Sequence, residues 1–151
     1  MSQYYRAQIT RECFHLVPAQ APQATLCGEQ LAGRLCHVTS RVLCRKCRDA
    51  YQAANNITTP RVRVKPVSET ALKKCSGAEG PIEAIMPQDG QWWLGIDTGT
   101  RRKGGVRKRL AADECLWTDD EVEPVNCDRK QLVWYGRIIE ALHRSPRYPG
   151  T

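Results

Sequence analysis

The sequence predicts an α+β protein, with a small N-terminal module followed by a small antiparallel β-sheet and a C-terminal helix. A Cys-x-x-Cys pair opens a helix-forming run over residues 44–55. An Asp-Gly pair at residues 89–90 separates two β-prone runs, a pattern typical of a hairpin. Near the end of the chain, apolar residues recur at spacings of three and four, which predicts an amphipathic helix. These residues are Leu132, Tyr135, Ile139 and Leu142.

The order of these segments predicts three parts. Tyr4 to Val17 is expected to be extended and to end at Pro18. Residues 57–70 are rich in Thr, Pro and Val and are interpreted as an extended linker. The N-terminal module is therefore placed at residues 1–56, and the sheet with its helix at residues 71–151. The expected elements of this last part are strands at Ile82–Met86, Gln91–Thr98 and Val106–Leu110 and a helix with Asp128 as its N-cap.

Composition limits the class of protein. Only 41% of the 151 residues are apolar, so the core is expected to be small and to need support from a metal. Eight cysteines are too few to mark a secreted disulfide scaffold. The first residues form no secretory signal, and no apolar run is long enough to span a membrane. We therefore expect a cytoplasmic protein in a reducing compartment.

Four residues in the first third have the chemistry of a zinc site. Cys44 and Cys47 form a Cys-x-x-Cys pair, which lets two thiolates reach one ion from a single turn. His15 and Cys27 can complete a tetrahedral set if the intervening strands pair. The sequence thus predicts a zinc-ribbon-like or knuckle-like module around one structural zinc ion.

The sequence offers other possible ligands in place of His15. Cys13 lies two residues before His15, so both face the same side of a strand. Cys36 and His37 are adjacent and offer two further donors inside the loop. Any of these three could replace His15. A second site built from Cys75, Cys115, Cys127 and His143 is weaker, since no two of them are closely spaced.

Residues around the expected ligands form a recognisable pattern. His15-Leu16 is followed by Thr-Leu-Cys-Gly at residues 25–28 and by Val-x-Cys-x-x-Cys at residues 42–47. Residues 15–54 in this respect resemble small zinc-finger-like proteins of actinobacteria and their phages. The resemblance covers about a quarter of the chain and implies the zinc ligands more than an activity.

Charge is distributed in alternating zones. The formal net charge is +7 overall, and residues 1–66 carry +7, residues 67–100 −3, residues 101–110 +6 and residues 111–151 −3. This layout is typical of a protein with one or two faces that meet a polyanion, although it also fits ordinary solubilising charge.

Residues 100–110 are expected to form a glycine-centred loop whose basic side chains contact a phosphate backbone. An exposed tryptophan could in addition stack on bases. The expected nucleic-acid-binding residues are Arg45, Lys46, Arg48, Arg101, Arg102, Lys103, Arg107, Lys108, Arg109 and Trp93.

These observations predict a non-enzymatic, zinc-stabilised protein that binds DNA or RNA. With three histidines and no grouped carboxylates in a metal frame, no catalytic constellation is evident. The alternative is a phage-type protein that binds and inhibits or modulates a host protein complex, such as a nucleic-acid-handling defence machine, in the cytoplasm of a bacterial host.

Overall fold

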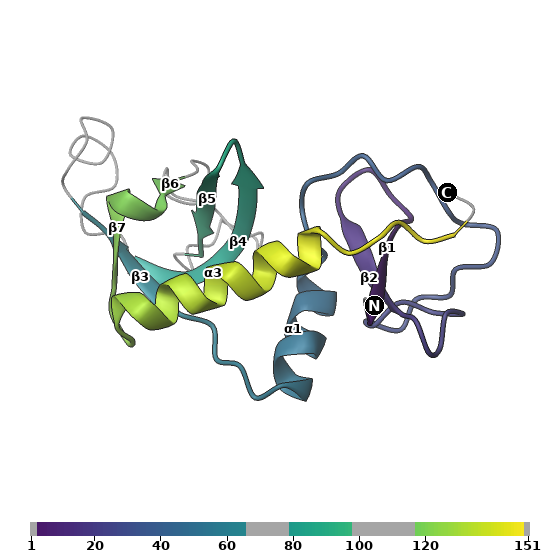
Figure 1. The fold of residues 1–151 in the computed structure, drawn as a ribbon, viewed down its shortest axis with the longest axis horizontal. Coiled ribbons are helices and arrows are strands. Elements are labelled where there is room, and N and C mark those ends of the chain that lie inside the picture. The colour runs from purple at the N-terminus through teal and green to yellow at the C-terminus, as the bar shows by residue number, and fades with distance from the viewer. Residues whose placement is uncertain (1–2, 66–78, 98–116, 150–151) are drawn as a thin grey trace, which may run out of the picture. The chain divides into compact units, whose positions relative to one another are not determined.

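The computed structural model describes residues 3–65, 79–97 and 117–149, and it confirms the predicted α+β class (Figure 1). The chain divides into two compact units. The first contains residues 1–58 and 138–151, and the second contains residues 59–137. The end of the chain therefore groups with the cysteine-containing residues, whereas the sequence had placed it with the sheet.

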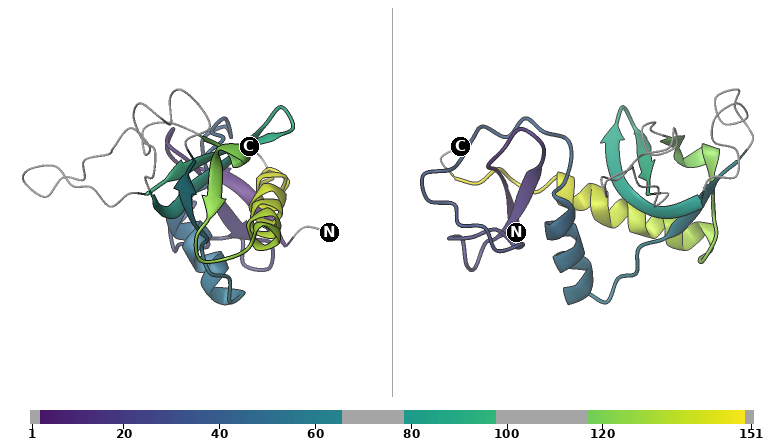
Figure 2. Two further views of the ribbon diagram at one scale, coloured as in Figure 1. Left: turned by 90° about the vertical axis from the view of Figure 1, so that its left-hand side faces the viewer. Right: turned by 180° about the vertical axis from the view of Figure 1, so that it is seen from behind.

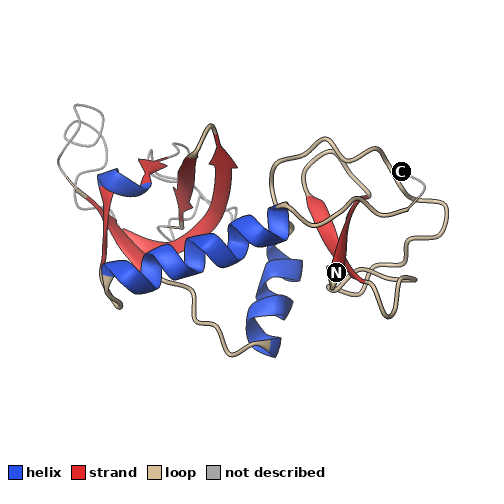
Figure 3. Ribbon diagram, in the orientation of Figure 1, coloured by secondary structure: helices blue, strands red, loops and turns tan. Residues whose placement is uncertain are grey.

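The first unit is built largely from loops around one short hairpin (Figure 3). Its strands are β1 (Tyr4–Gln8) and β2 (Phe14–Pro18), which pair antiparallel. The segment expected to be one extended piece thus contains two strands. Its polar residues 10–12 are exposed, which lets the chain reverse there without burying polar groups.

The last residues of the chain are bound to this hairpin by backbone hydrogen bonds. The Arg6 N–H donates to the Pro146 carbonyl at 2.8 Å, and the Tyr148 N–H donates to the Arg6 carbonyl at 2.8 Å. Tyr148 also packs against the small core of Ala7, Val17 and Leu31. These contacts explain why the C-terminal residues belong to the first unit.

Helix α1 (Arg45–Ala54) closes the first unit and confirms the helix predicted over residues 44–55. Asn55 is the C-cap residue that follows the helix, and Asn56 adopts a positive φ of 55°. Asparagine tolerates this left-handed conformation better than most residues, which makes it a suitable helix stop.

The second unit contains a five-stranded antiparallel sheet with the order β6-β5-β4-β3-β7. Strand β3 (Arg61–Val64) lies inside the segment expected to be a linker. Val62 and Val64 are fully buried, whereas the alternate residues Arg61 and Arg63 are exposed. The period-2 alternation, rather than the nearby prolines, therefore decides the conformation of this segment.

Strands β4 (Glu79–Gln88) and β5 (Gln91–Ile96) confirm the predicted hairpin. Asp89 and Gly90 have φ values of 54° and 75°, the positive pair that a type I′ turn requires. Strand β4 bends strongly, and its pairing register shifts between Ile82 and Ala84 (Figure 2).

The sheet is completed by β6 (Trp117–Thr118), a 3-10 turn at Asp119–Glu121 and β7 (Val122–Pro124). Among the described residues, the 3-10 turn comes directly before β7, the last strand of the sheet in chain order. The strand expected at residues 106–110 lies outside the described residues.

Helix α3 (Arg129–His143) confirms the predicted C-terminal helix. Asp128 is its N-cap as expected, because its carboxylate accepts the Gln131 N–H at 2.8 Å while the Gln131 side chain accepts the Asp128 N–H at 2.9 Å. All four periodic apolar residues of the helix are buried. Neither helix among the described residues has the length and apolarity to cross a membrane.

Candidate metal centre

Strand β2 positions the first donor. His15 lies opposite Ala7 in the β1–β2 hairpin, and only 6% of its surface is exposed. Its Nε2 is 3.4 Å from a carboxylate oxygen of Glu29. Its Nδ1 points to the sulfur atoms described below.

The second donor comes from a tight turn beside β2. The Gly28 N–H donates to the Thr25 carbonyl at 3.0 Å and closes the turn around Cys27. The Leu26 N–H donates to the carbonyl of Leu16 in β2 at 2.7 Å. The backbone thus holds Cys27 next to the strand that carries His15.

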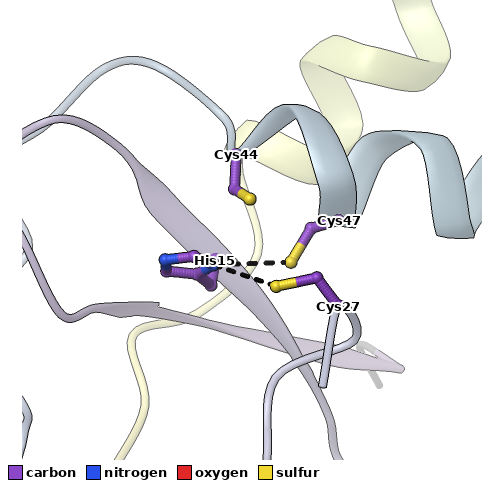
Figure 4. A group of neighbouring side chains, drawn as sticks. All are labelled: His15, Cys27, Cys44 and Cys47. Carbon is purple, nitrogen blue, oxygen red and sulfur yellow. Dashed lines mark hydrogen bonds between the residues drawn. The ribbon is translucent and has the colours of Figure 1, made fainter. Parts of the chain in front are cut away.

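The last two donors flank the start of α1. The Cys44 N–H donates to the Phe14 carbonyl of β2 at 2.8 Å, and the Cys44 carbonyl accepts the Arg48 N–H at 3.0 Å as the helix begins. Cys47 follows within the first turn of the helix. A Cys-x-x-Cys at a helix start therefore presents both sulfurs on one side (Figure 4).

The four predicted ligands converge on one point (Figure 4). Their donor atoms all lie within 4.8 Å of one another. His15 Nδ1 is 3.5 Å from Cys27 Sγ and 3.6 Å from Cys47 Sγ. A tetrahedral zinc ion with bonds of about 2.3 Å to sulfur and about 2.0 Å to nitrogen gives a nitrogen–sulfur separation of about 3.5 Å. The cluster could hold a metal ion, and its nitrogen–sulfur distances fit this geometry.

Hydrogen bonds within the cluster shift the pKa values of its members in different directions. A hydrogen bond from Cys47 lowers the pKa of the Cys44 thiol to about 3, against the effect of burial. The same hydrogen bond, together with burial, raises the pKa of Cys47. The pKa of His15 is raised, chiefly by its hydrogen bond to Cys44. The lowered pKa of Cys44 favours its thiolate, the form of cysteine that binds metals.

The three alternative ligands are not part of the four-residue cluster, although Cys13 lies next to it. Cys36 is exposed, and its thiol donates to the Ile9 carbonyl at 3.2 Å. His37 is exposed, and its Nε2 is 3.5 Å from Arg147 Nη1. Cys13 lies next to the cluster: its Sγ is 4.0 Å from His15 Nε2, and its side chain also has a hydrogen bond with Cys44. Burial is the main reason that the pKa of the Cys13 thiol is raised to about 11.

The second set of cysteines forms no cluster among the residues that the structure describes. Cys127 is half-buried in the second unit, and Cys75 and Cys115 lie outside the described residues. His143 belongs to the first unit, where its two ring nitrogens face the carbonyls of Ile139 and Arg41.

The predicted nucleic-acid-binding residues have different surroundings. Arg45 and Lys46 are exposed at the start of α1. Arg48 is only 5% exposed, with a guanidinium nitrogen 3.7 Å from the Asp49 carboxylate, so it does not present its charge at the surface as expected. Trp93 is half-buried in β5. The remaining basic residues, Arg101, Arg102, Lys103, Arg107, Lys108 and Arg109, lie outside the described residues.

The sequence reasoning missed two polar neighbours of the cluster, Thr25 and Glu29. Each lies two residues from Cys27, and each contacts a donor residue through its side chain. The signal that could have found them is the polar residue on either side of the expected ligand within one tight turn. Comparison with known protein families, with curated proteins and with solved structures finds no match for this chain.

Proposed function

We propose that the first unit is a zinc-stabilised module that binds DNA or RNA and has no enzymatic activity. The observation that carries the proposal is the convergence of His15, Cys27, Cys44 and Cys47 within 4.8 Å. Three thiolates and one imidazole form a donor set that suits zinc better than the harder ions magnesium and calcium.

A structural role for the ion follows from the number of ligands. Four protein donors fill a tetrahedral zinc shell, whereas catalytic zinc sites keep one position open for water or substrate. The ion would bind β2, the Cys27 turn and α1 together through their side chains, in addition to the backbone hydrogen bonds between them. Metal binding would therefore contribute directly to the folding free energy of the unit.

The net charge of the first unit favours a polyanionic partner. The first unit contains nine Lys and Arg residues against four Asp and Glu residues, a net charge of +5. Most of these basic side chains are exposed, and exposed Lys and Arg side chains are the groups that contact phosphates. The exposed ones are Arg11, Arg34, Arg41, Arg45, Lys46, Arg144 and Arg147.

The test joins elemental mass spectrometry with binding to labelled duplex and single-stranded nucleic acid over a range of salt. We expect one zinc ion per chain and an affinity that falls steeply as salt rises. The double variant Arg45→Gln/Lys46→Gln should bind more weakly and reduce the salt dependence. The matched control is Lys130→Gln/Arg137→Gln, which removes the same charge from exposed positions of the second unit.

The outcomes separate the two parts of the proposal. Zinc with no salt-sensitive binding would overturn the nucleic-acid part and leave the metal centre. A protein purified without any bound metal would overturn the centre itself.

A second candidate function is binding and modulation of a host protein complex. Trp134 favours it, because its side chain on α3 is 56% exposed and large exposed aromatic residues are enriched at protein interfaces. Capture of a defined complex from nuclease-treated bacterial lysate should then be lost in Trp134→Ala and kept in Arg45→Gln/Lys46→Gln. The opposite pattern would favour the nucleic-acid function.

A further inference from the structure

We infer that Glu29 and Thr25 are positioning residues of the metal centre, which select Nδ1 of His15 as the ligand atom and hold the sulfur of Cys27 in place. This inference rests on the proposed metal site and assigns roles to two residues outside the set of ligands. It is carried by contacts on both sides of Cys27 within a single turn.

The first contact concerns the tautomer of His15. A neutral imidazole has one N–H, so a ring that gives Nδ1 to a metal must carry its proton on Nε2. Glu29 places a carboxylate oxygen 3.4 Å from Nε2. Nδ1 lies between the sulfurs of Cys27 and Cys47, at 3.5 and 3.6 Å. The carboxylate thus favours the tautomer that leaves Nδ1 free to bind the ion.

The surroundings of the ring give Glu29 this role rather than Cys13. The Cys13 sulfur also lies on the Nε2 side of the ring, but at 4.0 Å, and sulfur is a weak acceptor. The His15 side chain is 7% exposed, so most of the ring is shielded from water. A buried N–H needs an acceptor, and the Glu29 carboxylate is the stronger of the two groups.

The second contact concerns the sulfur of Cys27. The Thr25 hydroxyl oxygen lies 3.1 Å from Cys27 Sγ. The same oxygen accepts the Glu29 backbone N–H at 2.9 Å, which leaves the hydroxyl proton free to point at the sulfur. A hydrogen bond donated to a ligand atom orients that ligand toward the ion.

The two contacts are coupled through the backbone. The Thr25 N–H donates to the Glu29 carbonyl at 2.8 Å, and Thr25 is 5% exposed. Residues 25 and 29 are therefore held together at the base of the turn that carries Cys27. This turn would supply Cys27 as a ligand and the Thr25 hydroxyl as a hydrogen-bond donor to the Cys27 sulfur. It would also supply the Glu29 carboxylate as the acceptor for His15.

The test measures zinc affinity of the full chain by competition with a chromophoric chelator. Glu29→Ala should weaken zinc binding by about 10- to 100-fold, the usual effect of losing an outer-shell partner. Glu29→Gln keeps an oxygen acceptor and should lose less. Thr25→Val should also weaken binding, whereas Thr25→Ser keeps the hydroxyl and should bind nearly as well as wild type. Glu12→Ala is the matched control, because it removes an exposed carboxylate from the same unit.

A second readout reports the tautomer directly. In zinc-loaded protein with ¹⁵N-labelled histidine, NMR should show a metal-bound Nδ1 and a protonated Nε2 at His15. Zinc bound through Nε2, or equal affinities for Glu29→Ala and Glu12→Ala, would overturn the inference while the metal site stands. A wild-type chain that binds no zinc would instead overturn the metal site on which the inference rests.

Discussion

Gly136 in α3 lies against the indole ring of Trp92 in β5, with no room for a Cβ atom between them. Glycine inside a helix costs about 1 kcal/mol relative to alanine, so the sequence alone marks this position as a weakness. The close approach of the ring gives the glycine a packing role that outweighs this cost.

We therefore expect Gly136→Ala to destabilise the protein despite its better helix propensity. Forcing a methyl group into a packed contact typically costs about 1–3 kcal/mol, more than the gain from propensity. Chemical unfolding at constant zinc concentration measures the change in the free energy of unfolding. In a Trp92→Leu background the clash is removed, and Gly136→Ala should become neutral or stabilising. Equal effects in both backgrounds would contradict this explanation.

The β4–β5 turn makes a second prediction about the backbone. Gly90 has a φ of 75°, and placing an L-residue with a side chain in this region costs about 1–2 kcal/mol. Gly90→Ala should therefore lower the free energy of unfolding by about that amount. Asp89→Asn is the control, since asparagine is equally suited to the first position of a type I′ turn. Urea unfolding followed by tryptophan fluorescence compares the three proteins, and an unchanged Gly90→Ala would contradict the assigned turn.

The parts of the fold that the sequence predicted depend on local chemistry. Asp89-Gly90, the Asp128 N-cap and the apolar spacing of α3 all act over a few residues, so they are visible in the chain itself. The convergence of His15, Cys27, Cys44 and Cys47 into a cluster that could hold a metal ion was also predictable, because the Cys44–Cys47 spacing is characteristic of such sites.

The parts that were missed depend on contacts between distant residues. The backbone pairing of Arg6 with Pro146 and Tyr148 joins the two ends of the chain and leaves no periodic signal in either segment. Strand β3 is stabilised by cross-strand ion pairs of Arg63 with Glu79 and Glu123, at 3.1 and 3.2 Å. These partners come from β4 and β7, so a reading of residues 57–70 alone could not supply them.

The cluster geometry predicts that substitutions of Cys44 and of Cys13 have different effects on the metal content of the protein. Cys44→Ser removes a donor and should lose the zinc ion, whereas Cys13→Ser leaves all four donors and should keep it. Structural zinc contributes an apparent binding free energy of about 10–16 kcal/mol in small zinc-finger peptides at neutral pH, so we expect Cys44→Ser to unfold the first unit. Elemental analysis and ¹H–¹⁵N spectra of both variants check the two statements. Loss of zinc in Cys13→Ser together with its retention in Cys44→Ser would show that the ligand set is wrong.

Acid should destabilise the first unit through His143. Burial lowers the pKa of this histidine below its usual value, and its ring packs edge-on against Phe14 with 5.1 Å between ring centroids. The nearby Arg6 lowers the pKa further, whereas Glu140 and hydrogen bonds to the carbonyls of Ile139 and Arg41 oppose the shift.

Because the unfolded chain takes up this proton at a higher pH than the folded chain does, the contribution of His143 is fully present above the unfolded pKa of about 6.5. It is lost as the pH falls through the lower, folded pKa. His143→Gln removes this titration, so the wild type should lose more unfolding free energy than the variant between pH 7.5 and pH 5. Protonation of the metal ligands affects both proteins and cancels in the difference between them. Parallel stability curves for the two proteins over this range would show that His143 titrates equally in both states.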